Sequence, residues 1–157
     1  MKRTAQLFLF TLLMSIILPA CKEDVYMDWK LKNEVWLENN KTQPGIITTP
    51  SGLQYKVLYE GWKFNRQPSV NSIIRVNYKG SLIDGSVFDS VATGKTIDMY
   101  LSGAIQGWKE ALPKMYDGAN YILYIPSKLG YDTIKSNVEI PPYSTLIFNI
   151  TLDSSYN

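Results

Sequence analysis

The sequence contains no histidine and a single cysteine, Cys21. A Ser-His-Asp or Cys-His hydrolase needs an imidazole to accept the proton of its nucleophile, so the lack of histidine excludes both classes. A zinc site draws its ligands mainly from histidine and cysteine, and one cysteine cannot supply a set. The sequence therefore predicts no metal site, no triad chemistry and no disulfide bond within the chain.

Phosphate-binding loops are lacking too. Gly80 and Gly85 lie between two predicted strands, and no helix follows them that could present its N–H groups to a phosphate. We therefore expect no nucleotide and no other cofactor.

No apolar run is long enough to cross a bilayer. The most apolar one, residues 7–17, has eleven residues, whereas a spanning helix needs about 20. It lies between the basic start Met1-Lys2-Arg3 and Leu18-Pro19-Ala20-Cys21, an order typical of an export signal. The last four residues resemble a bacterial lipobox, which implies that residues 1–20 are a cleaved lipoprotein signal peptide and that Cys21 carries the lipid. The alternative is an ordinary secretory peptide with an unrelated cysteine.

The chain has little excess charge of either sign. Lys2 and Arg3 are two of its 16 basic residues and lie in the predicted signal peptide, so the mature chain keeps 14 basic and 14 acidic side chains. A neutral chain gives no electrostatic indication of nucleic acid, and we expect none as a partner.

The lipid on Cys21 implies a membrane partner and a place in the cell envelope, with the outer membrane facing the periplasm as the expected site. Lys22-Glu23-Asp24 follows directly and resembles a surface-export signal of some lipoproteins. Exposure on the cell surface is therefore the alternative.

Residues 21–50 are expected to form a lipidated tether, a short helix and a linker. Between residues 25 and 39 apolar side chains recur at helical spacing. The stripe consists of Val25, Trp29 and Trp36, with Leu31 and Val35 beside it. We expect this helix to pack its tryptophans on the following domain. A dimerisation or client-holding arm is the alternative, and the oligomeric state stays open.

Beyond Ser51 the apolar period changes to the alternation of half-buried strands. The residues that share a face are Leu53, Tyr55 and Val57; Ile74, Val76 and Tyr78; Tyr121, Leu123 and Ile125; and Leu146, Phe148, Ile150 and Leu152. Residues 97–101 add a strand, and residues 107–112 a short helix that Pro113 limits. The pattern predicts an α+β domain in which one short helix covers a mostly antiparallel sheet.

Four separated motifs occur in this part of the chain. Residues 76–90 read Val-Asn-Tyr-Lys-Gly-Ser-Leu-Ile-Asp-Gly-Ser-Val-Phe-Asp-Ser. The others are Ser51-Gly52-Leu53-Gln54-Tyr55, Gly107-Trp108 and the run from Ile140 to Phe148. In order and spacing they resemble the FKBP-type peptidyl-prolyl cis-trans isomerases over residues 51–152. The resemblance implies a curved sheet wrapped around the short helix, in an isomerase domain at residues 51–154.

The resemblance also implies a pocket for a proline ring. Its catalytic residues would be Tyr78, Phe88, Asp89, Ile105, Trp108, Tyr131 and Phe148. Trp108 would form the floor, while the Ile105 N–H and the Tyr131 hydroxyl would donate to substrate carbonyls. Asp89 would accept a hydrogen bond from Tyr78. Further substrate contacts would come from Ile97, Ala104 and Ile140. Each of these aromatic residues taken alone would fit a position in the hydrophobic core. Together, in the order that the family has, they favour a binding site.

The sequence departs from the family pattern at three positions. Ile97 stands where many members have an aromatic residue, and Ala104 where valine or a similar residue is usual. We therefore expect a roomier, less aromatic rim that tolerates bulky residues before proline. Asp132 replaces a usual glycine, and residues 132–139 lack the common glycines, which predicts a different conformation for this segment.

Proline isomerisation suits a chain without a catalytic nucleophile. The barrier to amide rotation, about 18–20 kcal/mol, comes from resonance that is lost in the twisted transition state. Our hypothesis is an isomerase that assists the folding of exported or outer-membrane proteins, with proline-containing polypeptides as substrates. The alternative is a non-catalytic lipoprotein that binds or assembles polypeptides in the same cleft.

Overall fold

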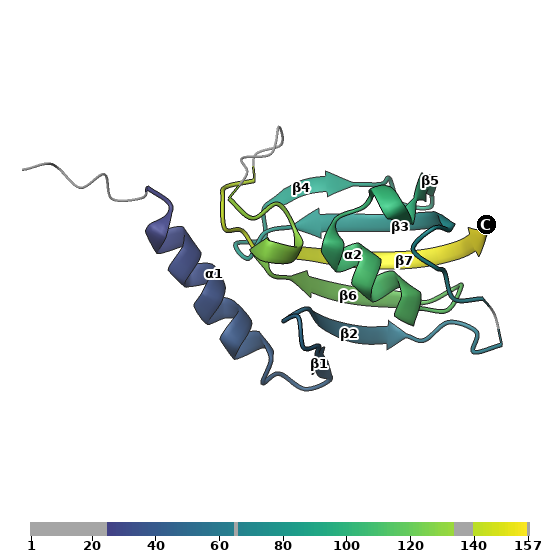
Figure 1. The fold of residues 1–157 in the computed structure, drawn as a ribbon, viewed down its shortest axis with the longest axis horizontal. Coiled ribbons are helices and arrows are strands. Elements are labelled where there is room, and N and C mark those ends of the chain that lie inside the picture. The colour runs from purple at the N-terminus through teal and green to yellow at the C-terminus, as the bar shows by residue number, and fades with distance from the viewer. Residues whose placement is uncertain (1–24, 65, 134–139, 157) are drawn as a thin grey trace, which may run out of the picture.

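The computed structural model of the protein describes residues 25–64, 66–133 and 140–156. The predicted signal peptide, Cys21 and the tether up to residue 24 lie outside these ranges, as do residues 134–139 of the segment where glycines are lacking. The described residues form an α+β fold in which an antiparallel sheet of seven strands curves around a short helix (Figure 1). This fold class was predicted, including the helix before the sheet.

The strands and helices follow the predicted order. The strands are β1 (Ile46–Thr48), β2 (Gln54–Tyr59), β3 (Ile73–Ser81), β4 (Val87–Ser90), β5 (Ile97–Tyr100), β6 (Asn120–Ile125) and β7 (Leu146–Tyr156). The helices are α1 (Met27–Asn40) and α2 (Gln106–Ala111), with 3-10 turns at Leu101–Gly103, Leu112–Lys114 and Ser127–Leu129. The strands pair in the order β1-β2-β6-β7-β3-β4, and β5 also pairs with β3. β1 lies in the segment that was expected to be a linker. The sequence did not predict this strand, because three residues are too few to show an alternation of apolar side chains.

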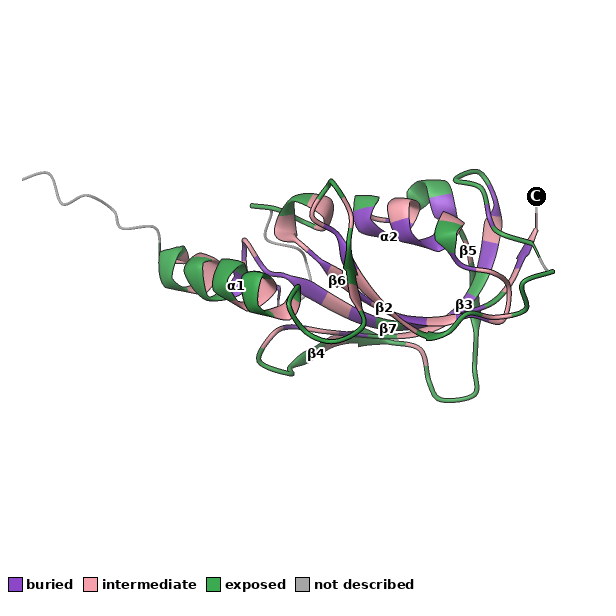
Figure 2. Ribbon diagram, turned by 90° about the horizontal axis from the view of Figure 1, so that it is seen from below, coloured by how far each residue is buried: buried purple, intermediate pink, exposed green. Residues whose placement is uncertain are grey.

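The core lies between the sheet and α2 (Figure 2). Alternate residues of β6 and β7 are buried, since successive side chains of a strand point to opposite faces. α2 can lie close to the sheet because Gly107 has no side chain: a Cβ there would lie 2.5 Å from Cγ2 of Ile125. α2 begins and ends one residue earlier than predicted, and a 3-10 turn that contains Pro113 follows it.

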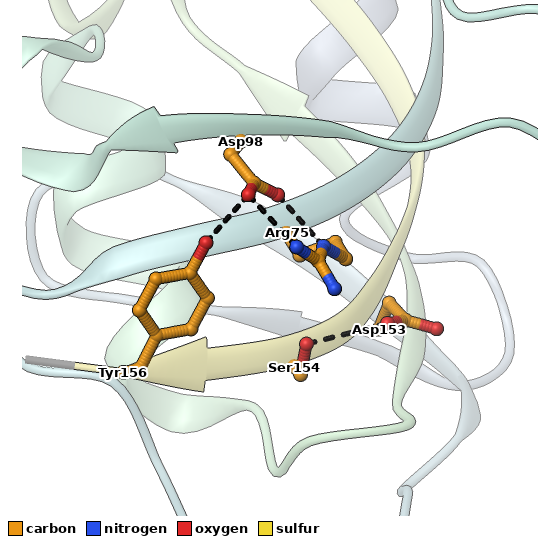
Figure 3. A network of polar contacts seen from close by, with 5 residues as sticks. All are labelled: Arg75, Asp98, Asp153, Ser154 and Tyr156. Atoms are coloured by element: carbon orange, nitrogen blue, oxygen red, sulfur yellow. Dashed lines mark hydrogen bonds and ion pairs between the residues drawn. The ribbon is translucent and has the colours of Figure 1, made fainter.

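An exposed polar network holds β5 against β3 and the end of β7 (Figure 3). Arg75 of β3 donates from Nε and Nη2 to the two carboxylate oxygens of Asp98 in β5, at 2.8 and 2.9 Å. The Tyr156 hydroxyl in β7 donates to Asp98 Oδ2 at 2.5 Å. The hydrogen bonds from Arg75 and then Tyr156 lower the pKa of Asp98 to about 2. The network fixes β5, and with it Met99 on the opposite face of the strand.

α1 begins two residues later and ends one residue later than predicted, and only part of the predicted stripe contacts the domain. Val25 is 91% exposed, and Leu31 and Val35 are exposed as well, so these members of the predicted stripe do not pack on the domain. None of the helices in the described ranges is long and apolar enough to cross a membrane.

The docked face of α1 centres on Asn33, which is only 2% exposed. The tryptophans on either side contact the domain: Trp29 donates from Nε1 to Ser144 Oγ at 2.9 Å, and the Trp36 ring lies 5.7 Å from that of Tyr124. The tryptophans thus pack on the domain as expected. The pattern missed Asn33 between them, because a hydrophobic period does not register an amide that is buried through its hydrogen bonds.

Candidate active site

A cavity of about 240 Å³ opens beside the first turn of α2. Its lining consists of Tyr78, Phe88, Asp89, Met99, Gly103, Ala104, Ile105, Trp108, Tyr131, Ile140 and Phe148. The structure thus brings together every predicted site residue except Ile97, and it adds Met99 and Gly103. Pockets for drug-sized ligands start at about 300 Å³, so this cavity suits one side chain with its flanking backbone.

Four aromatic rings form the base and walls of the cavity. Trp108 and Phe148, each 4% exposed, have ring centroids 5.2 Å apart and planes at 82°. Tyr78 meets Trp108 edge to face at 5.1 Å, and Phe88 meets Phe148 in the same way at 5.4 Å. This geometry places the positive edge of one ring on the negative face of the next. Because the rings come from β3, β4, α2 and β7, their packing fixes the shape of the cavity.

Gly80 in β3 leaves the space that this ring cluster needs. A Cβ at this position would lie 2.6 Å from Cζ of Phe88 and 2.9 Å from Cε1 of Phe148. Any larger residue would displace one of the two rings. Gly80 is therefore a functional part of the site that the sequence motif contains, although its role could not be read from the motif alone.

Tyr78 and Asp89 form the expected hydrogen bond across the β3–β4 pair. The Tyr78 hydroxyl donates to Asp89 Oδ2 at 2.6 Å. Burial raises the pKa of Tyr78, and the bond to the charged Asp89 raises it further. The phenol therefore stays protonated at neutral pH and continues to donate to Asp89.

Two hydrogen-bond donors border the cavity. Ile105 precedes α2, and its carbonyl accepts from Trp108 N–H and Lys109 N–H at 3.0 and 3.2 Å. Its own N–H reaches no acceptor within residues 25–64, 66–133 and 140–156. The second donor is the hydroxyl of Tyr131, which is 36% exposed. Burial, with a smaller effect of Asp89, raises the pKa of Tyr131, so this hydroxyl also keeps its proton at neutral pH.

The assignment of Ile97 to the substrate contacts needs correction. Ile97 is 40% exposed and pairs with Val76, whereas Met99, two residues further along β5, lines the cavity. Both side chains lie on the same face of the strand, so their alternation alone cannot tell which one reaches the pocket. Ala104 and Gly103 line the cavity with little side-chain bulk.

Asp132 has a backbone conformation that favours glycine. Its φ angle is 50°, in the left-handed region that aspartate tolerates better than most residues. Tyr143 has a φ angle of 64°, and its N–H donates to the Asp132 carbonyl at 2.7 Å. These two unusual residues are thus hydrogen-bonded to each other; Asp132 directly follows the cavity residue Tyr131, and Tyr143 lies three residues after the cavity residue Ile140. In the described part of the chain, no group of three acidic, cysteine or histidine residues could hold a metal ion.

Two sequence models of known families match the chain. The one described as FKBP-type peptidyl-prolyl cis-trans isomerase matches residues 65–153. The one described as domain amino terminal to FKBP-type peptidyl-prolyl isomerase matches residues 19–57, which include α1. The first match contains every residue that lines the cavity.

Similar proteins carry the same family name. The FKBP-type 22 kDa peptidyl-prolyl cis-trans isomerase of Escherichia coli (strain K12) is 42% identical over 118 residues, which cover 74% of this chain and 56% of the relative. Outer membrane protein MIP of Legionella longbeachae is 40% identical over 126 residues, 80% of this chain and 53% of the relative. The chain spans about half the length of the curated relatives it matches.

A solved structure agrees with these matches. The peptidyl-prolyl cis-trans isomerase of Pseudomonas syringae pv. tomato superposes with a TM-score of 0.78 at 29% identity, covering 86% of this chain and 99% of that chain. The family model extends over more than half of this chain and over the whole described cavity lining. The chain therefore belongs to the FKBP-type peptidyl-prolyl cis-trans isomerases.

Proposed function

We propose that the protein is a peptidyl-prolyl cis-trans isomerase and that the cavity beside α2 is its active site. The observation that carries this proposal is the cluster of four edge-to-face rings around a cavity suited to one proline side chain. Membership of the family supports it, as does the Ile105 N–H at the border of the cavity, which has no acceptor among the described residues.

The proposed mechanism uses differential binding of the twisted amide. A planar X–Pro amide has resonance and a larger charge separation, so water stabilises it more than the twisted form. Rings at the base of the cavity exclude water from the bound proline, which favours the twisted form. No residue needs to form a covalent bond, consistent with a chain that has no histidine.

The polar groups at the border would hold the substrate backbone while the amide rotates. The Ile105 N–H and the Tyr131 hydroxyl would each donate to a carbonyl that flanks the proline. Holding both sides limits the rotation to one bond. The hydrogen bond from Tyr78 to Asp89 keeps the ring of Tyr78 in place as a wall.

The test is an exchange-NMR or protease-coupled assay on a proline tetrapeptide, with a shortened protein that begins at Val25. We expect clear acceleration over the uncatalysed change, which takes tens to hundreds of seconds. Tyr131→Phe should lower kcat/KM about threefold to tenfold, the effect of one lost hydrogen bond. The matched control is Tyr100→Phe, because Tyr100 is 64% exposed and does not line the cavity.

A polypeptide-binding role without catalysis is the second candidate. It is favoured by a groove of about 750 Å³ beside α1, whose apolar lining includes Leu31, Val35, Trp36 and Ile83. Absence of acceleration at micromolar protein, together with binding of an unfolded polypeptide that Leu31→Lys abolishes, would support this role and contradict the isomerase proposal.

We also propose that the lipid on Cys21 anchors the protein in the cell envelope, where it assists the folding of exported or outer-membrane proteins. The order of residues 1–21 supports the anchor, and the name of the Legionella relative supports an outer-membrane location. Cys21→Ser should move the protein from the membrane fraction to the soluble fraction. Retention of the variant in membranes at the level of the parent would contradict a single anchor at Cys21.

A further inference from the structure

α1 contacts three consecutive residues of the chain that leads from the cavity into β7. Lys30 Nζ lies 5.2 Å from the centre of the Tyr143 ring. Trp29 Nε1 donates to Ser144 Oγ at 2.9 Å. Asn33 Oδ1 accepts from the Thr145 N–H at 2.7 Å in a fully buried contact. One face of a single helix thus holds residues 143–145.

These contacts are joined to the cavity by further hydrogen bonds. Ser144 Oγ, which accepts from Trp29, donates in turn to the Pro141 carbonyl at 2.7 Å. Pro141 follows Ile140, which is buried and lines the cavity. At the other end, Thr145 precedes β7, which carries the cavity residue Phe148. α1 therefore holds the middle of a segment with a cavity residue at each end.

The conformation of residues 143–145 depends on contacts with other parts of the chain. Tyr143 has a positive φ angle, which is unfavourable for a residue with a side chain and persists only where the surroundings hold it. Among its contacts are the hydrogen bond from its N–H to Asp132 and the cation above its ring. Asp132 follows Tyr131, so the same arrangement also restrains the second donor of the site.

Amides complete the attachment of α1. Asn33 Nδ2 donates to the Trp29 carbonyl at 2.8 Å, so both ends of this buried amide are bonded. Gln54 of β2, also buried, donates to the Leu37 carbonyl at 2.9 Å and accepts from Asn40 Nδ2 at 2.8 Å. We call the set of Trp29, Asn33, Gln54, Ser144 and Thr145 the α1 joint. Hydrogen bonds have narrow angular preferences, so the joint fixes the orientation of the 140–145 segment more tightly than apolar packing would.

We propose that α1 acts in catalysis as a positioning element: Trp29 and Asn33, through Ser144 and Thr145, set the place of Ile140 in the cavity wall. Neither Trp29 nor Asn33 lines the cavity. This inference rests on the proposed function for its kinetic consequence, while its structural consequence is independent of any activity.

The test compares two identical changes on the same helix, made in the full mature chain in detergent. Trp29→Phe removes the indole N–H that reaches Ser144 and keeps an aromatic ring. Trp36→Phe is the matched control, because the Trp36 ring packs on Tyr124 and, among the described residues, its side chain makes no hydrogen bond to residues 140–145. Each variant is measured for kcat and KM on a proline peptide and for the Ile140 δ1-methyl NMR signal.

We expect Trp29→Phe to raise KM about threefold to tenfold and to change kcat less than twofold. A displaced wall residue weakens binding of the planar and twisted amide alike, and uniform binding appears in KM. The Ile140 methyl signal should shift in Trp29→Phe and stay in place in Trp36→Phe. Ser144→Ala should reproduce both effects, and combining it with Trp29→Phe should add little, since the two changes break one connection.

Other outcomes separate this proposal from the proposed function. Equal effects of Trp29→Phe and Trp36→Phe on KM and on the methyl signal would overturn it, because α1 would then act only through general stability. Fully additive effects of Trp29→Phe and Ser144→Ala would overturn it as well. If the parent protein shows no isomerase activity, the proposed function fails, and the methyl signals alone decide whether Trp29 positions Ile140.

Discussion

The cavity and the α1 joint differ in the chemical groups that build them. The cavity is made of rings whose centroids lie 5.1–5.9 Å apart, and the Tyr78 hydroxyl donates to Asp89 beside them. The joint is made of amides, a hydroxyl and an indole N–H, with hydrogen bonds of 2.7–2.9 Å. Apolar packing gains free energy in proportion to area and tolerates small shifts. A buried hydrogen bond depends on direction, and each lost partner leaves a group unsatisfied.

The difference suits the two tasks. A surface that receives many different prolyl peptides benefits from contacts that have little directional preference, whereas a fixed connection between two segments benefits from strict geometry. The two regions share the chain from Ile140 to Phe148, so a change in one should reach the other only through that chain.

The largest effect is expected from removing the floor of the cavity. Trp108→Ala should lower the free energy of unfolding by about 3–5 kcal/mol, because the side chain is almost fully packed. Its indole N–H has no partner among the described residues, so the loss comes from packing and not from a broken hydrogen bond. Denaturant unfolding measures it, and a loss below about 1 kcal/mol would show that the ring is not part of the core.

The next effect tests whether the ring cluster has room to adjust. Gly80→Ala should cost about 3 kcal/mol, the upper end for overpacking, since the new methyl group meets both Phe88 and Phe148. Gly103→Ala is the matched control, because a Cβ at Gly103 meets nothing within 4 Å. Unfolding midpoints should differ clearly between the two variants. Equal midpoints would mean that the rings move aside without loss.

A smaller effect is expected in the joint. Asn33→Ala should cost about 2 kcal/mol, because the Thr145 N–H is then buried without an acceptor. Asn39→Ala on the exposed side of the same helix has the same gain in helix propensity and serves as the reference. The difference between the two unfolding free energies isolates the joint. If it is close to zero, water replaces the amide and the joint is not a rigid connection.

The cavity could be predicted largely from the sequence, whereas the joint could not. A pocket for a proline ring needs large aromatic residues, and the motif that contains Tyr78 and Phe88 can be recognised in the sequence. The short helix that carries Trp108 and the strands with alternating burial were also predictable, because each element shows its own apolar period.

What the sequence could not give depends on contacts between distant residues. The choice between Ile97 and Met99 depends on how far β5 reaches over the cavity, which the alternation of β5 does not contain. Asn33 counts as polar in any hydrophobic pattern, and one of the two hydrogen bonds that make its burial favourable comes from Thr145, 112 residues away. β1 is too short for a pattern and exists because it pairs with β2.

The smallest effect concerns pH and separates the joint from the network that holds β5. The pKa of Asp98 is lowered from 3.8 to about 2, so its contribution to stability is complete above pH 4 and is lost as the pH falls through about 2. The unfolding free energies of the parent and of Asp98→Asn should therefore converge between pH 4 and pH 2. The network is exposed, so the effect should be small and should shrink further with added salt.

The joint has no group that titrates in this range, and the penalty of Asn33→Ala should stay constant across the same series. A penalty that changes with pH in parallel with that of Asp98→Asn would show that the two regions unfold together and that the joint does not act as a separate connection.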